Sequence, residues 1–381
     1  MSLVDCYRGK RVLITGDTGF KGSWLAYWLC QLGAEVTGYA LPSVYPEGPF
    51  EGAKMCDMYT HVDGDIRSFE RLCGVMEEVH PDVVFHLAAQ ALVRKSYLRP
   101  LETVSTNIIG TVHLLEAVRL LQLSCAIVVV SSDKCYENKE WGYSYRENDA
   151  MGGHDVYSAT KGCAELMVSS YRRSFFQGQY TRVRTPVATV RAGNVIGPGD
   201  WAADRIIPDA MRSVRDGTVL RVRNPSAVRP WQHVLEPLSG YLWLGCLLQG
   251  GDSVLYEGAW NFGPNLISVW PVHRLVDAFM RTMNRGEWMD CSGDGHLHEA
   301  SCLALNIDKT VMQLNWHPVW DMQEAVTRTA EGYWALKKTQ GDYVAFRGFM
   351  KEEIDLYCHN AIESGVAWAM HPAGASGKEA E

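Results

Sequence analysis

A glycine-rich turn close to the start of the chain constrains the fold more than any other feature of the sequence. The segment TGDTGFKG places three glycines between a strand-like run, RVLIT, and a helix-like run, SWLAYWLCQLG. In this context glycines let the backbone approach a pyrophosphate, and the N-terminus of the helix points its free N–H groups at it. We therefore predict a dinucleotide site at this turn, formed by Gly16, Thr18, Gly19, Phe20, Lys21 and Gly22.

The rest of the N-terminal half repeats this alternation of strand and helix. Short β-branched runs predict strands at residues 34–40, 83–87, 126–131 and 187–192. The spacing of apolar residues predicts helices at 104–121 and 156–176. Such an order gives parallel strands joined by right-handed crossovers. The predicted fold class is therefore α/β, with a Rossmann-like doubly wound parallel sheet.

The alternation weakens after about Gly193, where Pro, Trp and Arg become frequent. This change predicts a mainly dinucleotide-binding domain at residues 1–193 and a smaller α/β lobe, mainly for substrate, at residues 194–370. Segments such as TVLRVR and WPVHRLVDAFMRTM continue the α/β pattern, so some later segments are expected to return to the first domain. The small, polar stretch at 371–381 predicts a disordered tail.

The net charge is −8, from 36 Lys and Arg against 44 Asp and Glu, which gives no reason to expect nucleic acid as a partner. No apolar stretch reaches the roughly 20 residues of a membrane helix, and the first residues carry charge, so we expect a cytoplasmic protein with no membrane partner. The eleven cysteines contain no C-x-x-C pair, which predicts reduced, packed thiols. No His/Cys/Asp cluster has metal-ligand spacing, so no metal is expected.

The residues that select the dinucleotide are only partly recognisable. In this kind of fold an acidic residue about 20 positions after the glycine turn bonds the adenosine ribose and selects NAD. Here the second strand ends GYALPSVYP, without Asp or Glu, so this rule leaves NAD and NADP both open. Asp65 and Ile66 lie where a third strand is expected to end, and we predict that they hold the adenine edge.

A second group of residues is suited to acid–base chemistry. Tyr157 and Lys161 form Y-x-x-x-K on a predicted helix, which puts both side chains on one face, one turn apart. The ammonium is then placed to lower the pKa of the phenol, so that Tyr157 takes a proton from an alcohol while a hydride leaves for a nicotinamide. Ser132 closes the strand AIVVVSS, at the edge where doubly wound sheets bind their ligands.

The glycine turn, Ser132 and Y-x-x-x-K, in this order and separation, resemble the extended short-chain dehydrogenase/reductase family of nucleotide-sugar enzymes. The resemblance implies Ser132, Tyr157 and Lys161 as a catalytic triad. It implies NAD as cofactor, with NADP not excluded, and a homodimer or higher homo-oligomer. It also implies that the segment HLAAQ, residues His86 to Gln90, lines the dinucleotide and the sugar. Within and near this segment, the implied dinucleotide contacts are Leu87, Ala88, Ala89 and Thr106, and the implied sugar contact is Gln90.

Within this family, the residues after the serine separate the reactions. Asp133 and Lys134 give S-D-K, which resembles the sugar-nucleotide 4,6-dehydratases, whose elimination of water needs an extra acid and an extra base. Longer segments, such as RAGNVIGPGDWAADRIIPD and RPWQHVLEPLSGYL, resemble the branch that acts on CDP-D-glucose in the biosynthesis of deoxysugars for the lipopolysaccharide O-antigen. The alternatives are a dehydratase of dTDP-, GDP- or UDP-hexoses, a sugar-nucleotide 4-epimerase, and a non-catalytic dinucleotide sensor.

The resemblance implies a redox-neutral dehydration. Tyr157 deprotonates the C4 hydroxyl of the glucose as hydride passes from C4 to NAD, and the resulting ketone acidifies the C5 proton. Lys134 removes that proton, Asp133 protonates the departing C6 hydroxyl, and the hydride returns to C6. These roles require a raised pKa for Asp133 and a lowered pKa for Lys134.

The second lobe supplies the predicted binding groups for the substrate. Arginine forks match the oxygens of a diphosphate bidentately. By resemblance, Trp201 and Trp231 shape the pocket, whereas His233 is expected to be packed rather than catalytic. The predicted substrate-binding residues of this lobe are Asn194, Arg205 and Arg229.

Overall fold

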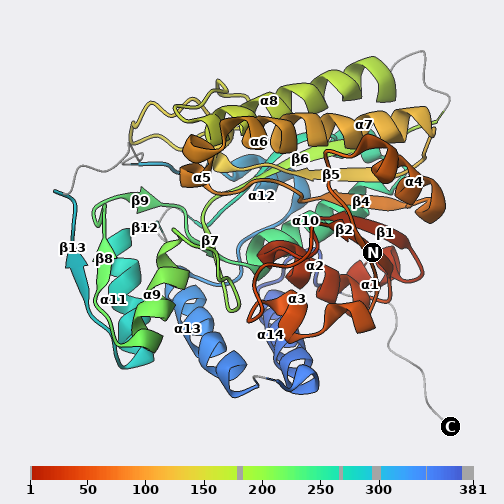
Figure 1. Cartoon of the computed structure of the whole chain (residues 1–381). Helices are drawn as coiled ribbons and strands as arrows, with labels where there is room; N and C mark the ends of the chain where they lie inside the picture. Colours follow the sequence, from red (N-terminus) through yellow and green to blue (C-terminus); the bar gives the residue numbers. More distant parts are fainter. Residues whose placement is uncertain (1, 178–182, 266–268, 294–301, 340, 371–381) are drawn as a thin grey trace, which may run out of the picture.

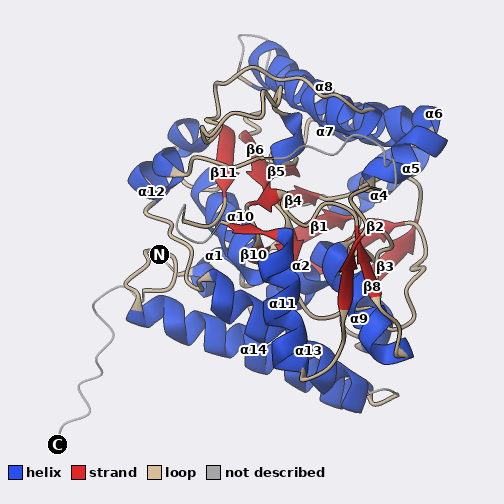
Figure 2. Cartoon of the chain, turned by 90° about the vertical axis from the view of Figure 1, so that its left-hand side faces the viewer, coloured by secondary structure: helices blue, strands red, loops and turns tan. Residues whose placement is uncertain are grey.

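The computed structural model describes residues 2–177, 183–265, 269–293, 302–339 and 341–370, so the tail predicted at 371–381 lies outside the described residues. A seven-stranded sheet, in which every neighbouring pair of strands is parallel, forms its centre (Figure 1, Figure 2). The spatial order is β11 (Gly258–Phe262), β6 (Val187–Ala192), β5 (Ala126–Val130), β4 (Val83–His86), β1 (Arg11–Thr15), β2 (Glu35–Ala40) and β3 (Thr60–Asp63). The strand order reverses between β1 and β4, and open parallel sheets bind ligands at the carboxyl ends of their strands at such a point.

Alternating apolar side chains let helices cover both faces of this sheet. On β1, Val12 and Ile14 belong to one core and Leu13 to the other, as the two-residue period of a strand requires. Fully buried Val, Leu and Ile side chains contribute roughly 1.5–3 kcal/mol each, which holds the strand ends in place. In Figure 1, α7 and α8 lie above the sheet and α1 and α2 below it. The first core is closed by α1 (Leu3–Tyr7), α2 (Phe20–Gln31), α10 (Leu235–Leu248) and α14 (Tyr343–Glu363), the second by α4 (Phe69–Val79), α7 (Gly110–Leu120) and α8 (Val156–Tyr171).

The strand predictions are confirmed, and the helix predictions need one correction. The strands predicted at 83–87, 126–131 and 187–192 are β4, β5 and β6, with ends that agree within one residue. The helix predicted at 104–121 consists of the end of α6 (Pro100–Val104), a π-helical segment η2 (Ser105–Ile109) and α7. The helix predicted at 156–176 is α8 followed by a second π-helical segment, η4 (Arg172–Phe176). A π-turn is defined by which backbone groups bond each other, and residue types alone do not reveal this, so the sequence pattern did not show it.

The chain after β6 builds a smaller lobe beside the sheet. Figure 1 shows its elements α9, α11, β8 and β13 together at one side of the molecule. The lobe is formed by α9 (Ile206–Asp216), α11 (Val272–Met283), α13 (Met322–Lys338) and the strand pairs β8 (Leu220–Val222) with β13 (Trp288–Asp290), β9 (Val228–Arg229) with β12 (Trp270–Pro271), and β7 (Val195–Ile196) with β10 (Gln232–His233). The remaining helices are short: α3 (Pro49–Gly52), η1 (Met55–Asp57), α5 (Val93–Leu98), η3 (Asp133–Cys135), η5 (Ser253–Tyr256) and α12 (Asp308–Leu314).

Helix α10 follows the lobe's first strands in the chain but packs against the large sheet. Its sequence, LEPLSGYLWLGCLL, is apolar on every side, and Tyr241, Leu242 and Leu244 have no exposed surface. A helix that is hydrophobic all round lies either in a protein core or in a membrane. Here α10 belongs to the core between the sheet and α14. Among the described helices, none is long and apolar enough to cross a membrane.

The cysteines depart from the sequence prediction at one pair. Cys6 next to the end of α1 and Cys246 in α10 form a disulfide with their Cα atoms 5.5 Å apart, so the prediction of reduced thiols is wrong for these two residues. They are 240 positions apart in the sequence, and only the packing of α1 on α10 brings them together. The other nine cysteines form no disulfide within the described structure, and Cys125 and Cys135 among them are buried.

Candidate active site

One cavity of about 1410 Å³ is lined by the residues predicted from the sequence to belong to a site, except His86, whose buried ring is bonded to Thr15 and Thr111 instead. It lies at the carboxyl ends of β1, β4, β5 and β6, between the sheet and the lobe. Pockets for one small ligand usually measure about 300–1,000 Å³, so this cavity has room for two. The predicted residues that line it are Gly16, Thr18, Gly19, Phe20, Lys21, Gly22, Asp65, Ile66, Leu87, Ala88, Ala89, Gln90, Thr106, Ser132, Asp133, Lys134, Tyr157, Lys161, Asn194, Arg205 and Arg229.

The first part of the cavity is the glycine turn between β1 and α2. Gly16 has a φ of +82°, and a Cβ there would lie 2.7 Å from the backbone nitrogen of Ala88. A Cβ at Gly22 would lie 2.1 Å from the carbonyl oxygen of Gly16. Both positions therefore require glycine, which brings the turn against the end of β4. The cap of α2, Gly19, offers no side-chain acceptor to the first N–H groups of the helix, which suits them to a pyrophosphate.

A buried carboxylate orders this turn from inside. Asp17 Oδ2 accepts a hydrogen bond from the Tyr59 hydroxyl at 3.0 Å and lies 2.7 Å from Nδ1 of His61 in β3. The same oxygen lies against Gly38 of β2, where a Cβ would come within 2.0 Å of it. Asp17 therefore ties the turn to two strands of the sheet. The sequence analysis did not assign this structural role to Asp17, although the residue stands in the glycine motif.

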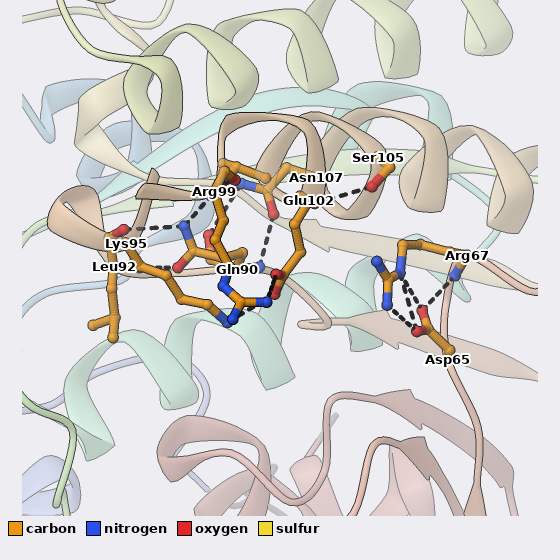
Figure 3. Close-up of polar contacts among 10 residues, drawn as sticks. Asp65, Arg67, Gln90, Leu92, Lys95, Arg99, Glu102, Ser105 and Asn107 are labelled. Carbon is orange, nitrogen blue, oxygen red and sulfur yellow. Dashed lines mark hydrogen bonds and ion pairs between the residues drawn. The ribbon is translucent and has the colours of Figure 1, made fainter. Parts of the chain in front are cut away.

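The segment after β3 lines the cavity, and Figure 3 shows Asp65 and Arg67 of this segment in contact with each other. The side chain of Asp65 accepts a hydrogen bond from Nε of Arg67 at 2.9 Å. Its backbone carbonyl accepts a hydrogen bond from the Tyr39 hydroxyl, also at 2.9 Å. The hydrogen bond from Arg67 lowers the pKa of Asp65, which keeps its carboxylate ionised. Ile66 packs against Gly110 of α7, where a Cβ would lie 2.7 Å from Cγ2 of Ile66. This strand end is thus fixed from two sides.

Gln90 follows β4 and is held by a network that includes Asn107 (Figure 3). Its side-chain amide donates to the Thr103 hydroxyl and to the Leu92 carbonyl, both at 3.0 Å, and its N–H donates to Asn107 Oδ1 at 2.8 Å. Asn107 Nδ2 in turn donates to the Thr160 hydroxyl on α8 at 3.0 Å. Asn107 lies in η2, and π-turns are frequent at functional sites. Asn107 was not predicted from the sequence; the available signal was an asparagine among the apolar residues of a predicted helix.

Ser132, Asp133 and Lys134 form a tight turn after β5. The Ser132 hydroxyl donates to Asp133 Oδ1 at 2.9 Å, and the Lys134 N–H donates to Ser132 Oγ at 3.2 Å. Asp133 is 3% exposed, and its other oxygen, Oδ2, is buried without a hydrogen-bond partner among the described residues. Burial raises the pKa of Asp133, against the opposing effects of Lys134 and of the Ser132 hydrogen bond. The predicted direction of this pKa shift is confirmed.

Tyr157 and Lys161 lie one turn apart near the start of α8, which Asp155 caps by accepting from the Ser158 N–H at 2.9 Å. Lys161 Nζ donates to the Val130 carbonyl at the end of β5, 3.2 Å away. Burial lowers the pKa of Lys161 to about 8. Burial also raises the pKa of Tyr157 to about 12, and the nearby Ser132 hydroxyl acts in the opposite direction. Desolvation therefore outweighs the effect of the surrounding polar and charged groups on this phenol.

Cations gather in the cavity although the chain is acidic overall. Eleven Lys and Arg side chains line it, against nine Asp and Glu side chains. Arg205, at the N-cap of α9, pairs with Asp200 at 2.8 Å, and this carboxylate raises the pKa of Arg205. Arg229 donates to the Val228 carbonyl at 2.9 Å, and its charge opposes the burial that raises the pKa of Asp133. Local charge at this site thus differs in sign from the net charge of the chain.

On the side of the lobe, the cavity is lined by Asn194, Trp201 and Trp231. Trp201 donates from Nε1 to the Glu47 carbonyl at 2.9 Å, which joins the lobe to the segment after β2. His233 has no exposed surface, and burial lowers its pKa to about 3, so it is a packed residue. In the part of the chain that the structure describes, no group of three or more His, Cys, Asp or Glu side chains is placed to hold a metal ion.

Several known proteins with a similar sequence or fold are dehydratases or epimerases of nucleotide sugars. Residues 13–254 match the family model described as GDP-mannose 4,6 dehydratase. The CDP-glucose 4,6-dehydratase of Salmonella typhimurium is 48% identical over 324 residues, which cover 84% of this chain and 90% of that relative. Two solved structures share the fold. The first is the dTDP-glucose 4,6-dehydratase of Bacillus anthracis in complex with NAD, which has a TM-score of 0.69 and 21% identity, and the match covers 87% of this chain and 99% of that one. The second is the UDP-glucose 4-epimerase of Thermotoga maritima with UDP-glucose, which has a TM-score of 0.71 and 19% identity, and the match covers 86% of this chain and 99% of that one. The chain therefore belongs to the GDP-mannose 4,6 dehydratase family.

Proposed function

We propose that this protein converts CDP-D-glucose to CDP-4-keto-6-deoxy-D-glucose in an NAD-dependent, redox-neutral dehydration. The observation that carries the proposal is the pair Asp133 and Lys134, which Ser132 holds in the same cavity as Tyr157. A 4-epimerase has no use for a further acid and base, whereas elimination of water needs both. The 48% identity to a CDP-glucose 4,6-dehydratase over 84% of the chain supports the choice of nucleotide.

The glycine turn and the segment after β3 fit a dinucleotide. Gly16, Gly19 and Gly22 would hold its pyrophosphate at the N-terminus of α2, and Asp65 and Ile66 would border its adenosine. When bound, NAD supplies a hydride acceptor for C4 of the sugar and later a hydride donor for C6. The structurally similar dTDP-glucose 4,6-dehydratase of Bacillus anthracis binds NAD, which supports NAD over NADP.

The protein's own groups handle the protons. Tyr157 receives the proton of the C4 hydroxyl, and Ser132, which lines the same cavity, polarises the same oxygen. Lys134 removes the C5 proton and later returns it, and Asp133 gives its proton to the departing C6 hydroxyl. The raised pKa of Asp133 suits it to this role, because a carboxylic acid with an ordinary pKa holds almost no proton at neutral pH.

The substrate diphosphate requires local positive charge, which the lobe provides. Arg205 and Arg229 line the cavity together with Asn194, and a guanidinium binds phosphate oxygens bidentately. Both arginines also act electrostatically on the reacting groups, Arg205 on Tyr157 and Arg229 on Asp133. We therefore assign them to the phosphate nearest the sugar.

The test is an incubation with CDP-, dTDP-, GDP- and UDP-glucose, followed by alkali and measurement of the ultraviolet absorbance of a 4-keto-6-deoxy sugar. We expect the signal with CDP-glucose, with a higher kcat/KM than with the other three. Formation of a galactose nucleotide without that signal would identify an epimerase instead.

A substitution separates the two stages of the reaction. Lys134→Met should leave dinucleotide binding unchanged and stop the incorporation of solvent deuterium at C5, because no base then removes that proton. Mass spectrometry of the product measures the deuterium. Unchanged turnover of the variant would exclude Lys134 from the mechanism.

We also propose a homodimer or higher homo-oligomer in the cytoplasm. Apolar side chains are exposed on neighbouring helices: Leu98 in α5 is 83% exposed, Leu101 in α6 82%, and Leu166 in α8 59%. Large exposed apolar side chains on helices that pack together are the kind of surface that a partner covers. Nine of the eleven cysteines form no disulfide, which is usual in a reducing compartment. Light scattering, which measures the molar mass in solution, tests the oligomer.

A further inference from the structure

The carboxylate of Asp17, inside the glycine turn, is buried in a place that calls for a positive charge. Asp17 has no exposed surface, and two groups converge on its Oδ2: the Tyr59 hydroxyl at 3.0 Å and Nδ1 of His61 at 2.7 Å. Its other oxygen, Oδ1, is buried and has no hydrogen-bond partner among the described residues. A buried carboxylate is costly unless a charge partner lies beside it.

His61 in β3 has a carboxylate oxygen at each of its ring nitrogens. Nδ1 lies 2.7 Å from Asp17 Oδ2, and Nε2 lies 3.3 Å from Oδ1 of Asp63. An ionised carboxylate only accepts hydrogen bonds, and a neutral imidazole has a single N–H to donate. Both contacts are therefore satisfied together only by the doubly protonated imidazolium. The ring is enclosed, since the side chain is 9% exposed and the ring of Phe50 in α3 packs edge-on against it, with centroids 5.0 Å apart.

The surroundings of this pair favour the charged ring. Burial lowers the pKa of His61, but the hydrogen bonds and charges of Asp17 and Asp63 outweigh this effect, so the pKa lies above its ordinary value of 6.5. The cations Lys54 and Arg347 pair with Asp57 in η1, at 3.0 Å and 3.7 Å. Besides Asp17 and His61, the titratable groups gathered here are Tyr59, Glu51 in α3, Cys56 and Asp57 in η1, Asp63 in β3 and Cys30 in α2.

The main chain of Asp17 connects this charge pair to the glycine turn. Its carbonyl accepts a hydrogen bond from the Ser23 hydroxyl in α2 at 2.9 Å. The residue before it, Gly16, has a φ of +82°, and its N–H donates to the Tyr39 carbonyl in β2 at 2.9 Å. The side chain of Asp17 adds a tie from the same turn to β3 through His61. A change in the position of Asp17 therefore moves the turn.

We propose that the imidazolium of His61 is a positioning group for the dinucleotide, because its charge holds Asp17, and with it the glycine turn, in the conformation that binds the pyrophosphate. When His61 releases a proton to solvent, the Asp17 carboxylate is left buried without a charge partner, and the turn loosens as Asp17 moves toward water. Dinucleotide binding and protonation of His61 therefore favour each other. This coupling involves the dinucleotide and not the sugar nucleotide, so it is independent of the substrate proposed above.

The experiment compares variants that remove one charge of the pair or both. Isothermal titration calorimetry measures the affinity of the full chain, freed of dinucleotide, for NAD in the absence of a sugar nucleotide. We expect His61→Gln, which leaves a buried carboxylate, to weaken NAD binding about tenfold at about pH 7. Asp17→Asn should weaken it less than about threefold, because His61 is then able to lose its proton. Combining the two changes should restore the affinity to within about threefold of wild type.

The pH dependence gives a second readout of the charge. The ratio of the NAD affinities of wild type and His61→Gln should shrink as the pH rises from about 7 to about 9.5, because the wild type then loses the same charge. Lys21, which titrates in this range, is present in both proteins and affects both affinities alike. The control is His359→Gln, since His359 is 66% exposed on α14 and pairs with Glu363. It should leave the NAD affinity unchanged at every pH.

The ring of His61 is also observable without any substitution. In nitrogen NMR of histidine-labelled wild-type protein, it should carry a proton on both ring nitrogens at about pH 7.5, where a histidine of ordinary pKa is mostly neutral. A neutral ring at this pH would overturn the proposal, even if the variants did not fold. A double variant that binds NAD no better than His61→Gln would also overturn it, since His61 would then act through its shape and hydrogen bonds and not through its charge. Failure of the proposed function is a separate outcome, because the four nucleotide glucoses would then give no product while these NAD affinities stay as expected.

Discussion

At the N-terminus of α2, Lys21 has a charge that depends on pH near neutrality. Burial, with the positive charges of Arg205 and Lys161, lowers its pKa to about 7. Its Nζ lies 6.0 Å from the ring centroid of Tyr241, and the residue lines the cavity beside the glycine turn. Lys21 therefore attracts an anion at this turn when the pH is below about 7, and this attraction weakens as the pH rises.

We predict that Lys21→Met weakens dinucleotide binding about tenfold at about pH 6, because a hydrogen bond to a charged group contributes roughly 1.5–3 kcal/mol. The difference in dinucleotide affinity between wild type and variant should narrow toward about pH 9. Lys21 is then neutral in the free protein, and it must take up a proton before its ammonium can bind the anion. Isothermal titration calorimetry at both pH values measures it. Lys351→Met, on the exposed side of α14, is the control. An equal loss at both pH values would contradict a titrating Lys21.

The order of the motifs along the chain predicted which residues lie together in the site, because a parallel sheet brings the carboxyl ends of its strands to one edge. Gly16 after β1, Ala88 after β4 and Ser132 after β5 lie far apart in the chain and line one cavity. The sequence did not reveal the state of each side chain. The pKa of Tyr157 depends on desolvation by the whole fold, and the partner of Asp17 comes from β3, which no local spacing indicates.

At the scale of elements, a buried ion pair joins α8 to β6. Glu165 lies one turn beyond Lys161, and its Oε1 accepts from Nε of Arg191 at 2.8 Å. Both side chains are almost fully buried, with 1% of Arg191 and 3% of Glu165 exposed. Arg191 Nη1 also donates to the hydroxyl of Tyr136, directly after η3, at 2.8 Å. The pair thus fixes the helix that carries Tyr157 relative to the turn that carries Asp133.

We predict that Arg191→Met lowers the free energy of unfolding by about 3–5 kcal/mol, because it leaves the Glu165 carboxylate buried without its charge partner. Removing both partners, in Glu165→Gln with Arg191→Met, should cost less than the sum of the two single changes. Denaturation in guanidinium chloride measures these differences. Lys351→Ala breaks an exposed pair with Asp355 and should change the free energy by less than about 1 kcal/mol. If Arg191→Met also changed the free energy of unfolding by less than about 1 kcal/mol, the pair of Arg191 and Glu165 would not be what holds α8 in place.

The elements were predictable to different degrees. Strands β4, β5 and β6 are short β-branched runs buried on both faces, and their ends were found within one residue. The π-helical segments η2 and η4 were not found, because a π-turn depends on which backbone groups bond each other and not on residue type. The position of β11 at the edge of the sheet depends on packing across the chain, which has no local signature.

At the scale of the whole molecule, one buried carboxylate joins the C-terminal helices to the rest of the fold. Glu236 in α10 accepts from the N–H of Trp320 at 2.7 Å and from the N–H of Val319 at 3.0 Å. It also accepts from the hydroxyl of Tyr357 in α14 at 2.8 Å. The segment before α13 and the middle of α14 are therefore held by a single side chain. Burial raises the pKa of Glu236 to about 7.

This shift makes stability depend on pH in a known direction. An unfolded glutamate has a pKa of 4.5, so the folded chain binds a proton more tightly than the unfolded chain between 4.5 and about 7. The contribution of Glu236 is fully present below pH 4.5 and falls by about 3 kcal/mol as the pH rises through this window. Glu236→Gln keeps an acceptor for the two N–H groups but does not ionise.

We therefore predict that Glu236→Gln gains stability relative to wild type as the pH rises from about 5 to about 8, by about 3 kcal/mol in total. Guanidinium chloride midpoints measured at intervals across this range give the difference at each pH. Glu352→Gln, on the exposed side of α14, controls for the removal of one carboxylate from the surface. A difference that stays constant with pH, or that favours wild type as the pH rises, would mean that Glu236 is ionised throughout. The C-terminal helices would then be held by a buried charge, and the hydrogen bonds from Val319, Trp320 and Tyr357 would have to offset the full cost of its desolvation.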